Sequence, residues 1–171
     1  KILSPNEEGI GEIVTKGENT MIGYYKNPKA TKESFTKDGW LRTGDLGMID
    51  EDGFLYIKGR SKTMLLGPSG QNIYPEEIEA KLNNMPYVLE SLVLQHKDNR
   101  LVALVCPDYN EVDASGMTAE QLVEQMEEAR KQVNSELAAY EQIAIVKLYP
   151  NEFEKTPKKS IKRFLYTNMV D

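Results

Sequence analysis

Residues 39–62 read GWLRTGDLGMIDEDGFLYIKGRSK and hold two β-prone runs joined by a tight turn. In the second run, aromatic and aliphatic side chains alternate from Phe54 to Ile57, which is the pattern of a strand. The connection DEDG ends in Gly53, which can adopt the positive φ that a tight turn requires. This stretch therefore predicts antiparallel strands rather than helices.

The chain divides into two parts that differ in composition and in predicted secondary structure. Most of the 12 glycines lie before residue 62, between short β-prone runs, which predicts a small β-rich, barrel-like segment. Beyond it, Pro75 suits the first position of a helix and Thr118 opens a second helix with a capping box. Two apolar runs, residues 88–95 and 101–105, flank a polar turn and predict a hairpin. The expected fold class is α+β, with the β-rich segment followed by a compact α+β C-terminal domain.

Composition excludes several classes of protein. The 171 residues carry a net charge of -6, which argues against a general nucleic-acid binder. Cys106 and His96 are the only residues of their types, so clustered Cys and His metal sites are nearly excluded and a reducing, cytoplasmic setting is expected. No apolar run approaches the ~18 residues that span a bilayer. Because the chain opens on Lys1 rather than Met, we expect a fragment of a longer protein.

Two candidate site residues lie within residues 39–62. Asp45 stands between two glycines, where a carboxylate can be presented to both hydroxyls of a ribose. Arg60 follows the second strand, and its planar guanidinium suits phosphate or sugar oxygens. The alternatives are an ordinary Gly-Asp turn and a solvated arginine.

Two further segments lie downstream. The glycine-rich loop of residues 67–75 runs into a helix N-terminus and can meet an anion, although it lacks the lysine and the spacing of a P-loop. The basic tail of residues 155–163 suits phosphate oxygens such as those of CoA. A loop needed only for its turn and a solvated charged face are the alternatives.

The order and spacing of these segments carry more information than any one of them. The segments GEIVTKGENTMIGYYKNP, GWLRTGDLGMIDEDGFLYIKGRSK and GQNIYPEEIE are followed by a tail containing TPKKS. Together they resemble the adenylate-forming (AMP-binding) superfamily, which includes acyl-CoA synthetases, peptide-synthetase adenylation domains and firefly luciferase. The chain looks like the C-terminal part of a long-chain fatty acid–CoA ligase.

The resemblance implies a domain organisation. Residues 1–61 would be the last β-barrel portion of a large N-terminal domain, and residues 62–171 the mobile C-terminal domain. Lys62 matches the hinge about which the small domain swings between an adenylating and a thioester-forming pose. Gly70 matches the glycine whose loop lines the pantetheine path in the second pose.

The resemblance also assigns nucleotide contacts. Asp45 would bind the ribose hydroxyls of ATP and of the acyl-adenylate. Ile57 would lie against the nucleotide, and Arg60 would contact ribose or phosphate. No metal ligand is assigned to this chain, since Mg²⁺ would be bound mainly by the missing N-terminal domain.

The tail departs from the family pattern P-x-T-x-x-G-K, whose lysine stabilises charge during adenylation. Counted without a gap from Thr156, the lysine position holds Ser160 and the glycine position holds Lys159. Either Lys159 reaches the site by a one-residue shift, or Lys162 substitutes, or this subgroup dispenses with the charge.

The function implied is that of an AMP-forming acyl-CoA ligase, in which a carboxylate, ATP and CoA give acyl-CoA, AMP and pyrophosphate. A long-chain fatty acid is the expected substrate, with peripheral membrane contact through it, and the isolated fragment is expected to be inactive. The alternatives are an acyl-carrier-protein ligase or peptide-synthetase-type adenylation domain, and a catalytically silent interaction module. The expected partners are the small-molecule substrates and the chain's own N-terminal domain, with no nucleic acid.

Overall fold

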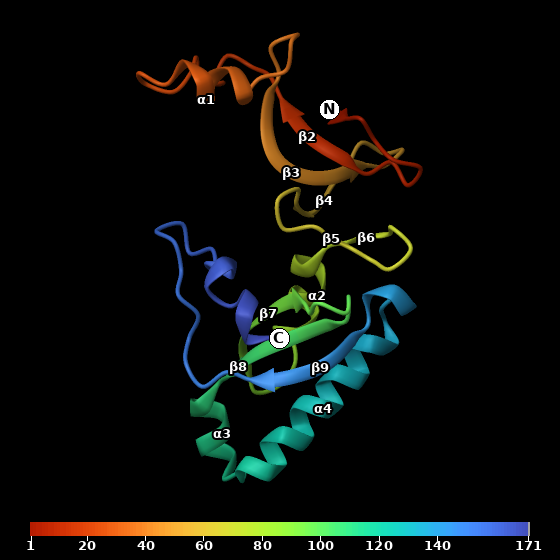
Figure 1. Ribbon diagram of the computed structural model, residues 1–171, viewed down its shortest axis with the longest axis vertical. Helices are drawn as coiled ribbons and strands as arrows, with labels where there is room; N and C mark the ends of the chain where they lie inside the picture. Colours follow the sequence, from red (N-terminus) through yellow and green to blue (C-terminus); the bar gives the residue numbers. More distant parts are fainter. Residues whose placement is uncertain (171) are drawn as a thin grey trace. The chain divides into compact units, whose positions relative to one another are not determined.

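The computed structural model describes residues 1–170 and divides the chain into two compact units, Lys1–Met64 and Leu65–Asp171 (Figure 1). Antiparallel strands fill the first unit, and helices join strands in the second. This mixture confirms the predicted α+β class. None of the helices within residues 1–170 is long and apolar enough to cross a membrane.

The first unit is built on a four-stranded antiparallel sheet of order β1-β2-β3-β4. Its elements are β1 (Ile2–Leu3), β2 (Gly11–Thr15), α1 (Pro28–Glu33), β3 (Leu41–Ile49) and β4 (Leu55–Arg60). The two β-prone runs are β3 and β4, and the turn between them has Gly53 at φ 87°. The Asp50 carboxylate closes this turn by accepting a 2.8 Å hydrogen bond from the Phe54 amide.

Gly47 allows close packing in the middle of this sheet. It lies beside a register shift between β3 and β4. A Cβ atom at this position would lie 2.4 Å from the carbonyl oxygen of Tyr56 and 2.9 Å from the side chain of Ile13. Any larger residue would therefore push the neighbouring strands away from β3.

The second unit has a three-stranded sheet of order β7-β8-β9. The predicted hairpin is present as β7 (Val88–Gln95) and β8 (Leu101–Pro107), and β9 (Ile143–Leu148) runs parallel to β8. Its helices are α2 (Pro75–Leu82), α3 (Tyr109–Ser115) and α4 (Ala119–Ser135). The small elements are β5 (Leu65–Leu66), β6 (Asn72–Ile73), η1 (Ala139–Glu141), η2 (Arg163–Leu165) and η3 (Thr167–Met169). The predicted capping box is confirmed, since Thr118 and Gln121 exchange backbone-to-side-chain hydrogen bonds at the start of α4.

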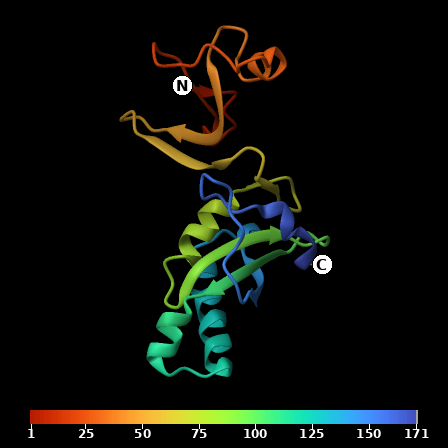
Figure 2. The same ribbon diagram turned by 90° about the vertical axis from the view of Figure 1, so that its left-hand side faces the viewer.

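Both faces of this sheet are covered. Helices α2 and α4 pack on one face through Ile78, Leu82, Leu122, Met126 and Val133, against Val93, Ala103 and Val105. The C-terminal segment packs on a second cluster through Phe153, Tyr166 and Val170, against Leu92, Leu94, Val102, Leu104 and Cys106. Figure 2 shows this segment, in blue, beside the green strands. Apolar residues therefore occupy consecutive positions of β7 and β8, as strands buried on both faces require.

Candidate functional site

Asp45 and Arg60 are direct partners across β3 and β4. The Nε atom of Arg60 lies 2.8 Å from Oδ1 of Asp45, and the two side chains are 62% and 30% exposed. A carboxylate that can accept and a guanidinium that can donate thus stand side by side at the surface. The structure brings together the two residues that the resemblance assigned to the ribose and phosphate of a nucleotide.

Asp45 lies within strand β3 rather than in a Gly-Asp turn, and this part of the strand is held by polar groups that the sequence did not single out. Gly44 has φ 76° and donates its amide to Oε1 of Glu12 at 3.3 Å. The hydroxyl of Thr43 accepts the Asp45 amide at 3.1 Å and donates to the Ile13 carbonyl at 2.8 Å. These bonds fix the backbone that carries the carboxylate, and no local sequence pattern predicts the two that reach Glu12 and Ile13.

Ile57 lies on β4 in register with Gly47, three residues before Arg60. Its side chain is 66% exposed within the described residues, and its neighbours Phe54 and Tyr56 are also exposed. β4 is an edge strand of this sheet. An exposed apolar edge of this kind indicates a surface that meets another partner, either ligand or protein.

Lys62 stands in a short turn that ends the first unit. The Arg60 carbonyl accepts the amides of Thr63 at 3.2 Å and Met64 at 3.1 Å. The Lys62 side chain is exposed. The predicted hinge position is therefore part of a local turn two residues before the boundary between the units.

Gly70 belongs to the loop between β5 and β6. It has φ 84°, and a Cβ atom there would meet nothing within 4 Å, so its requirement is conformational rather than steric. The loop closes on itself, since the Gly67 amide donates to the Gln71 carbonyl at 2.8 Å and the Gly70 amide to the Gly67 carbonyl at 2.9 Å. The loop borders a cavity of about 380 Å³ whose lining also includes Arg100 and Tyr140.

The basic tail forms a small loop closed by an antiparallel bridge between Lys155 and Ile161. The Thr156 amide donates to the Ser160 carbonyl, and the Lys159 amide to the Thr156 carbonyl, both at 2.8 Å. Lys159 has φ 60°, the left-handed conformation that favours glycine. The residue that occupies the family's glycine position therefore has a glycine-like backbone, as expected for an ungapped register from Thr156.

The cations of the tail are not equivalent, so the tail is not simply a solvated face. Lys155 pairs with Glu90 at 2.6 Å, and Lys162 pairs with Glu154 at 3.3 Å. Within residues 1–170, Lys159 makes no ion pair, and its side chain is exposed near the tip of the loop. Of the two lysines proposed to replace the missing charge, Lys159 is the more accessible.

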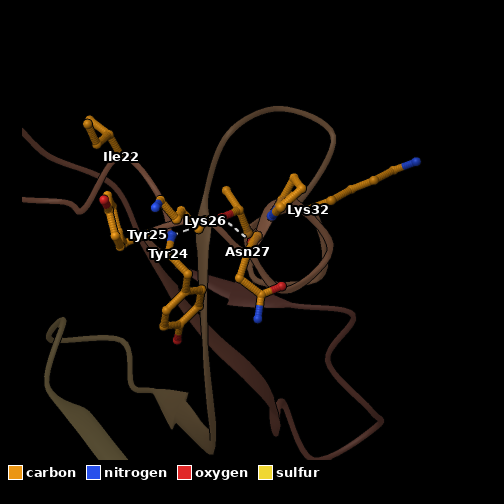
Figure 3. A pocket seen from close by; sticks show the side chains of 9 residues that line it. Ile22, Tyr24, Tyr25, Lys26, Asn27 and Lys32 are labelled. Carbon is orange, nitrogen blue, oxygen red and sulfur yellow. Dashed lines mark hydrogen bonds between the residues drawn. The ribbon is translucent and has the colours of Figure 1, made fainter.

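The loop before α1 borders another hollow, which the sequence reasoning did not identify (Figure 3). Its volume is about 610 Å³, and its lining includes Ile22, Tyr24, Tyr25, Asn27 and Lys32. Three large side chains of this lining, Ile22, Tyr24 and Tyr25, are exposed, and Ile22 is fully exposed. The signal was present in the quoted segment MIGYYKNP, where a cluster of apolar residues precedes a helix.

No group of three or more His, Cys, Asp or Glu residues that could hold a metal ion occurs in the part of the chain that the structure describes. Burial raises the pKa of the Cys106 thiol, and nearby Glu90 adds to this effect. This cysteine is therefore unsuited to nucleophilic chemistry at neutral pH.

Comparisons with known proteins agree with this geometry. The sulfoacetate–CoA ligase of Cupriavidus necator is 55% identical over 82 residues, which cover 48% of this chain and 16% of that protein. The long-chain-fatty-acid–CoA ligase FadD15 of Mycobacterium tuberculosis is 32% identical over 172 residues, covering 90% of this chain and 28% of that protein. The matched regions thus span less than a third of the length of these curated relatives.

A solved structure extends the similarity to the fold. O-succinylbenzoate coenzyme A synthetase (MenE) of Bacillus subtilis, solved in complex with AMP, has a TM-score of 0.70 and 30% identity. The match covers 95% of this chain and 30% of that one. Residues 63–169, more than half of the chain, match the family described as AMP-binding enzyme C-terminal domain. The predicted resemblance is confirmed, and the chain belongs to the AMP-binding enzyme C-terminal domain family.

Proposed function

We propose that this chain is the C-terminal part of an AMP-forming acid–CoA ligase. In the first half-reaction, the substrate carboxylate attacks the α-phosphate of ATP and releases pyrophosphate. In the second, the thiol of CoA attacks the acyl-adenylate and releases AMP. The observation that carries the proposal is the Asp45–Arg60 pair on adjacent strands, combined with membership of the family.

We assign the nucleotide to the first unit. Asp45 accepts the ribose hydroxyls, Arg60 donates to ribose or phosphate oxygens, and Ile57 offers an apolar surface to the nucleotide. All three side chains lie on β3 and β4, so one pair of strands supplies the set. We assign the binding of Mg²⁺ and of the ATP phosphates mainly to the N-terminal domain of the parent enzyme.

We assign the change of pose to the junction between the units. Residues 62–171 swing about Lys62, so the tail loop serves adenylation and the Gly70 loop serves thioester formation. The tight, self-closed geometry of the Gly70 loop supports this role, because a preformed loop can line a narrow path for pantetheine. One site can in this way first exclude water and then admit a thiol.

The identity of the acid substrate is the most specific part of the proposal, and we propose a long-chain fatty acid. FadD15, which matches 90% of this chain, is named a long-chain-fatty-acid–CoA ligase. A sulfoacetate–CoA ligase is 55% identical over 82 residues, so similar C-terminal sequences occur in ligases that are named for different acids. We therefore place selection of the acid in the missing N-terminal domain.

The test is ATP–pyrophosphate exchange by the purified full-length parent. We expect exchange that depends on the acid, with long-chain fatty acids preferred over sulfoacetate and succinylbenzoate, followed by acyl-CoA formation when CoA is added. Exchange without transfer to CoA, but with transfer to a phosphopantetheinylated carrier protein, would favour the carrier-protein alternative. Absence of exchange with every acid would favour a silent module, the possibility to which Ser160 at the family's lysine position points.

A further inference from the structure

The tail loop is attached to the body of the second unit at two buried carboxylates. Glu90 on β7 holds the start of the loop, and Glu79 on α2 holds its end. Both side chains are only 12% exposed. Neither residue has a role in the proposed nucleotide site.

The first attachment is made by both oxygens of Glu90. Oε1 accepts the Phe153 amide at 2.6 Å, and Oε2 lies 2.6 Å from Nζ of Lys155. Lys155 also faces Glu152 at 3.5 Å. The Glu90 carboxylate thus holds the backbone and the first cation of the loop at the same time.

The second attachment joins three segments. Oε1 of Glu79 accepts the Val93 amide at 2.7 Å and lies 2.6 Å from Nη2 of Arg163. Nη1 of Arg163 donates to the Val93 carbonyl at 3.0 Å, and Glu76 lies 3.7 Å from the same guanidinium. Arg163 is thereby fixed to α2 and β7 by its planar fork, which a lysine could not reproduce.

Between these attachments, the loop has only local bonds. Its bridge joins Lys155 to Ile161, and Lys162 pairs with Glu154 from within the same segment. The tip with Lys159 is exposed. Ile161 also packs on the apolar cluster that contains Phe153 and Tyr166. The position of the tip therefore depends on the two polar attachments and on this one apolar contact.

Stability alone does not explain why ion pairs occupy these two positions. Apolar side chains of similar volume often stabilise a protein as well as a buried ion pair does. The C-terminal segment already has apolar contacts, through Phe153, Tyr166 and Val170. Directional bonds at both ends add what apolar packing lacks, which is a defined position and orientation for the loop between them.

We propose that Glu79 with Arg163, and Glu90 with Lys155, are positioning residues that hold the tail loop for adenylation. The inference rests on the proposed function, in which the tip of this loop supplies charge to the first half-reaction. Glu79 lies on α2, which starts two residues after β6 and thus follows the Gly70 loop directly. Both loops belong to the second unit, so we expect them to change places together when the pose changes.

The first experiment needs no catalysis and uses the 171-residue chain. Trypsin needs the chain on both sides of the cleaved bond to be released from the fold, so the rate of cleavage after Lys158 and Lys159 reports how well the loop is held. We expect Glu79→Ala and Glu90→Ala each to raise this rate about tenfold or more, because each removes a carboxylate that holds the loop and leaves every trypsin site in place. The matched control is Glu136→Ala, which removes an exposed ion pair with Lys81, a residue of α2, and should leave the rate unchanged.

The second experiment uses the full-length parent and measures the two half-reactions separately. We expect Glu79→Ala and Glu90→Ala to lower kcat of pyrophosphate exchange about tenfold, with KM for ATP unchanged, because the loop is misplaced rather than the nucleotide site. Transfer from preformed acyl-adenylate to CoA should change less than about twofold. Thermal melts show whether each variant is folded under the assay conditions.

Four results would overturn the inference. Unchanged trypsin cleavage in both variants would mean that the carboxylates do not hold the loop. Faster cleavage with unchanged exchange, or an equal loss in both half-reactions, would leave them a purely structural role. A parent without any exchange would remove the proposed function and the positioning role together, whereas the cleavage rates would still separate a held loop from a loose one.

Discussion

At the scale of single residues, the Asp45–Arg60 pair contributes little to the stability of the fold. Its arginine is largely exposed, and exposed ion pairs are typically worth about 0–1 kcal/mol. The pair lies on a backbone that is fixed independently, through Thr43 and Glu12. Substitutions at Asp45 can therefore report on ligand binding without disturbing the sheet.

The first prediction concerns Asp45→Ala in the full-length parent. Loss of a charged acceptor for the ribose removes about 1.5–3 kcal/mol, so kcat/KM for ATP should fall roughly ten- to a hundredfold. The melting temperature should stay close to that of the wild type. Asp52→Ala, an exposed carboxylate in the turn between β3 and β4, is the control, and equal ATP kinetics in the two variants would remove Asp45 from the site.

The second prediction distinguishes the tail lysines. Lys159→Ala should slow pyrophosphate exchange by about 10²-fold, which is typical of losing one electrostatic stabiliser. Transfer from preformed adenylate to CoA should be nearly normal. Lys162 is already paired with Glu154, so Lys162→Ala should have the smaller effect. The reverse order of effects would show that Lys162 supplies the charge, and no effect of either would favour a silent module.

At the scale of elements, the contact between α2 and the tail carries a titratable group. Burial raises the pKa of Glu79 to about 7, against the opposing attraction of Arg163, while Glu76 adds repulsion. Between the usual glutamate pKa and about 7, the folded state keeps a proton that the unfolded chain has released. The free energy of unfolding should therefore fall as pH rises through this window.

The third prediction follows from this sign. Urea unfolding of the 171-residue chain between pH 4.5 and 7 should show a decline in stability that Glu79→Gln abolishes. Carboxyl-carbon NMR should show one glutamate that titrates near neutral pH and disappears in the same variant. A wild-type chain in which every glutamate titrates near its ordinary pKa would contradict the prediction.

The fourth prediction concerns the turn that contains Lys62. Proline fixes φ near -65°, so Lys62→Pro in the parent should favour one pose of the second unit. It should spare one half-reaction and slow the other at least about tenfold. Lys62→Ala keeps the freedom of the backbone and is the matched control. Equal effects on both half-reactions would mean that this turn is not the hinge.

At the scale of the whole molecule, the chain matches only 16% and 28% of the length of two longer relatives. The fifth prediction is that the 171-residue chain folds but makes no measurable acyl-CoA from acid, ATP and CoA. The reason is that the phosphate-binding loop and the acyl pocket are expected in the missing N-terminal domain. Circular dichroism should confirm folding, and turnover by the purified chain would refute the assignment.

The sequence alone determined the local structure of this protein. The DEDG turn, the hairpin of β7 and β8 and the capping box at Thr118 were predictable, because each depends on residues close together in the chain. The ordered motifs also identified the family. These features depend on local conformational preferences and on the spacing of motifs, and both can be read without knowledge of the packing.

Only the tertiary structure decided which distant polar groups meet. Arg163 lies 84 residues from Glu79 along the chain, and Phe153 lies 63 residues from Glu90. Nothing in the local sequence distinguishes these two glutamates from the others, because their partners are selected by the way the C-terminal segment packs on the sheet. The availability of Lys159, in contrast to Lys162, was decided in the same way. Long-range pairings arise from the joint packing of several elements, and no single stretch of sequence contains that information.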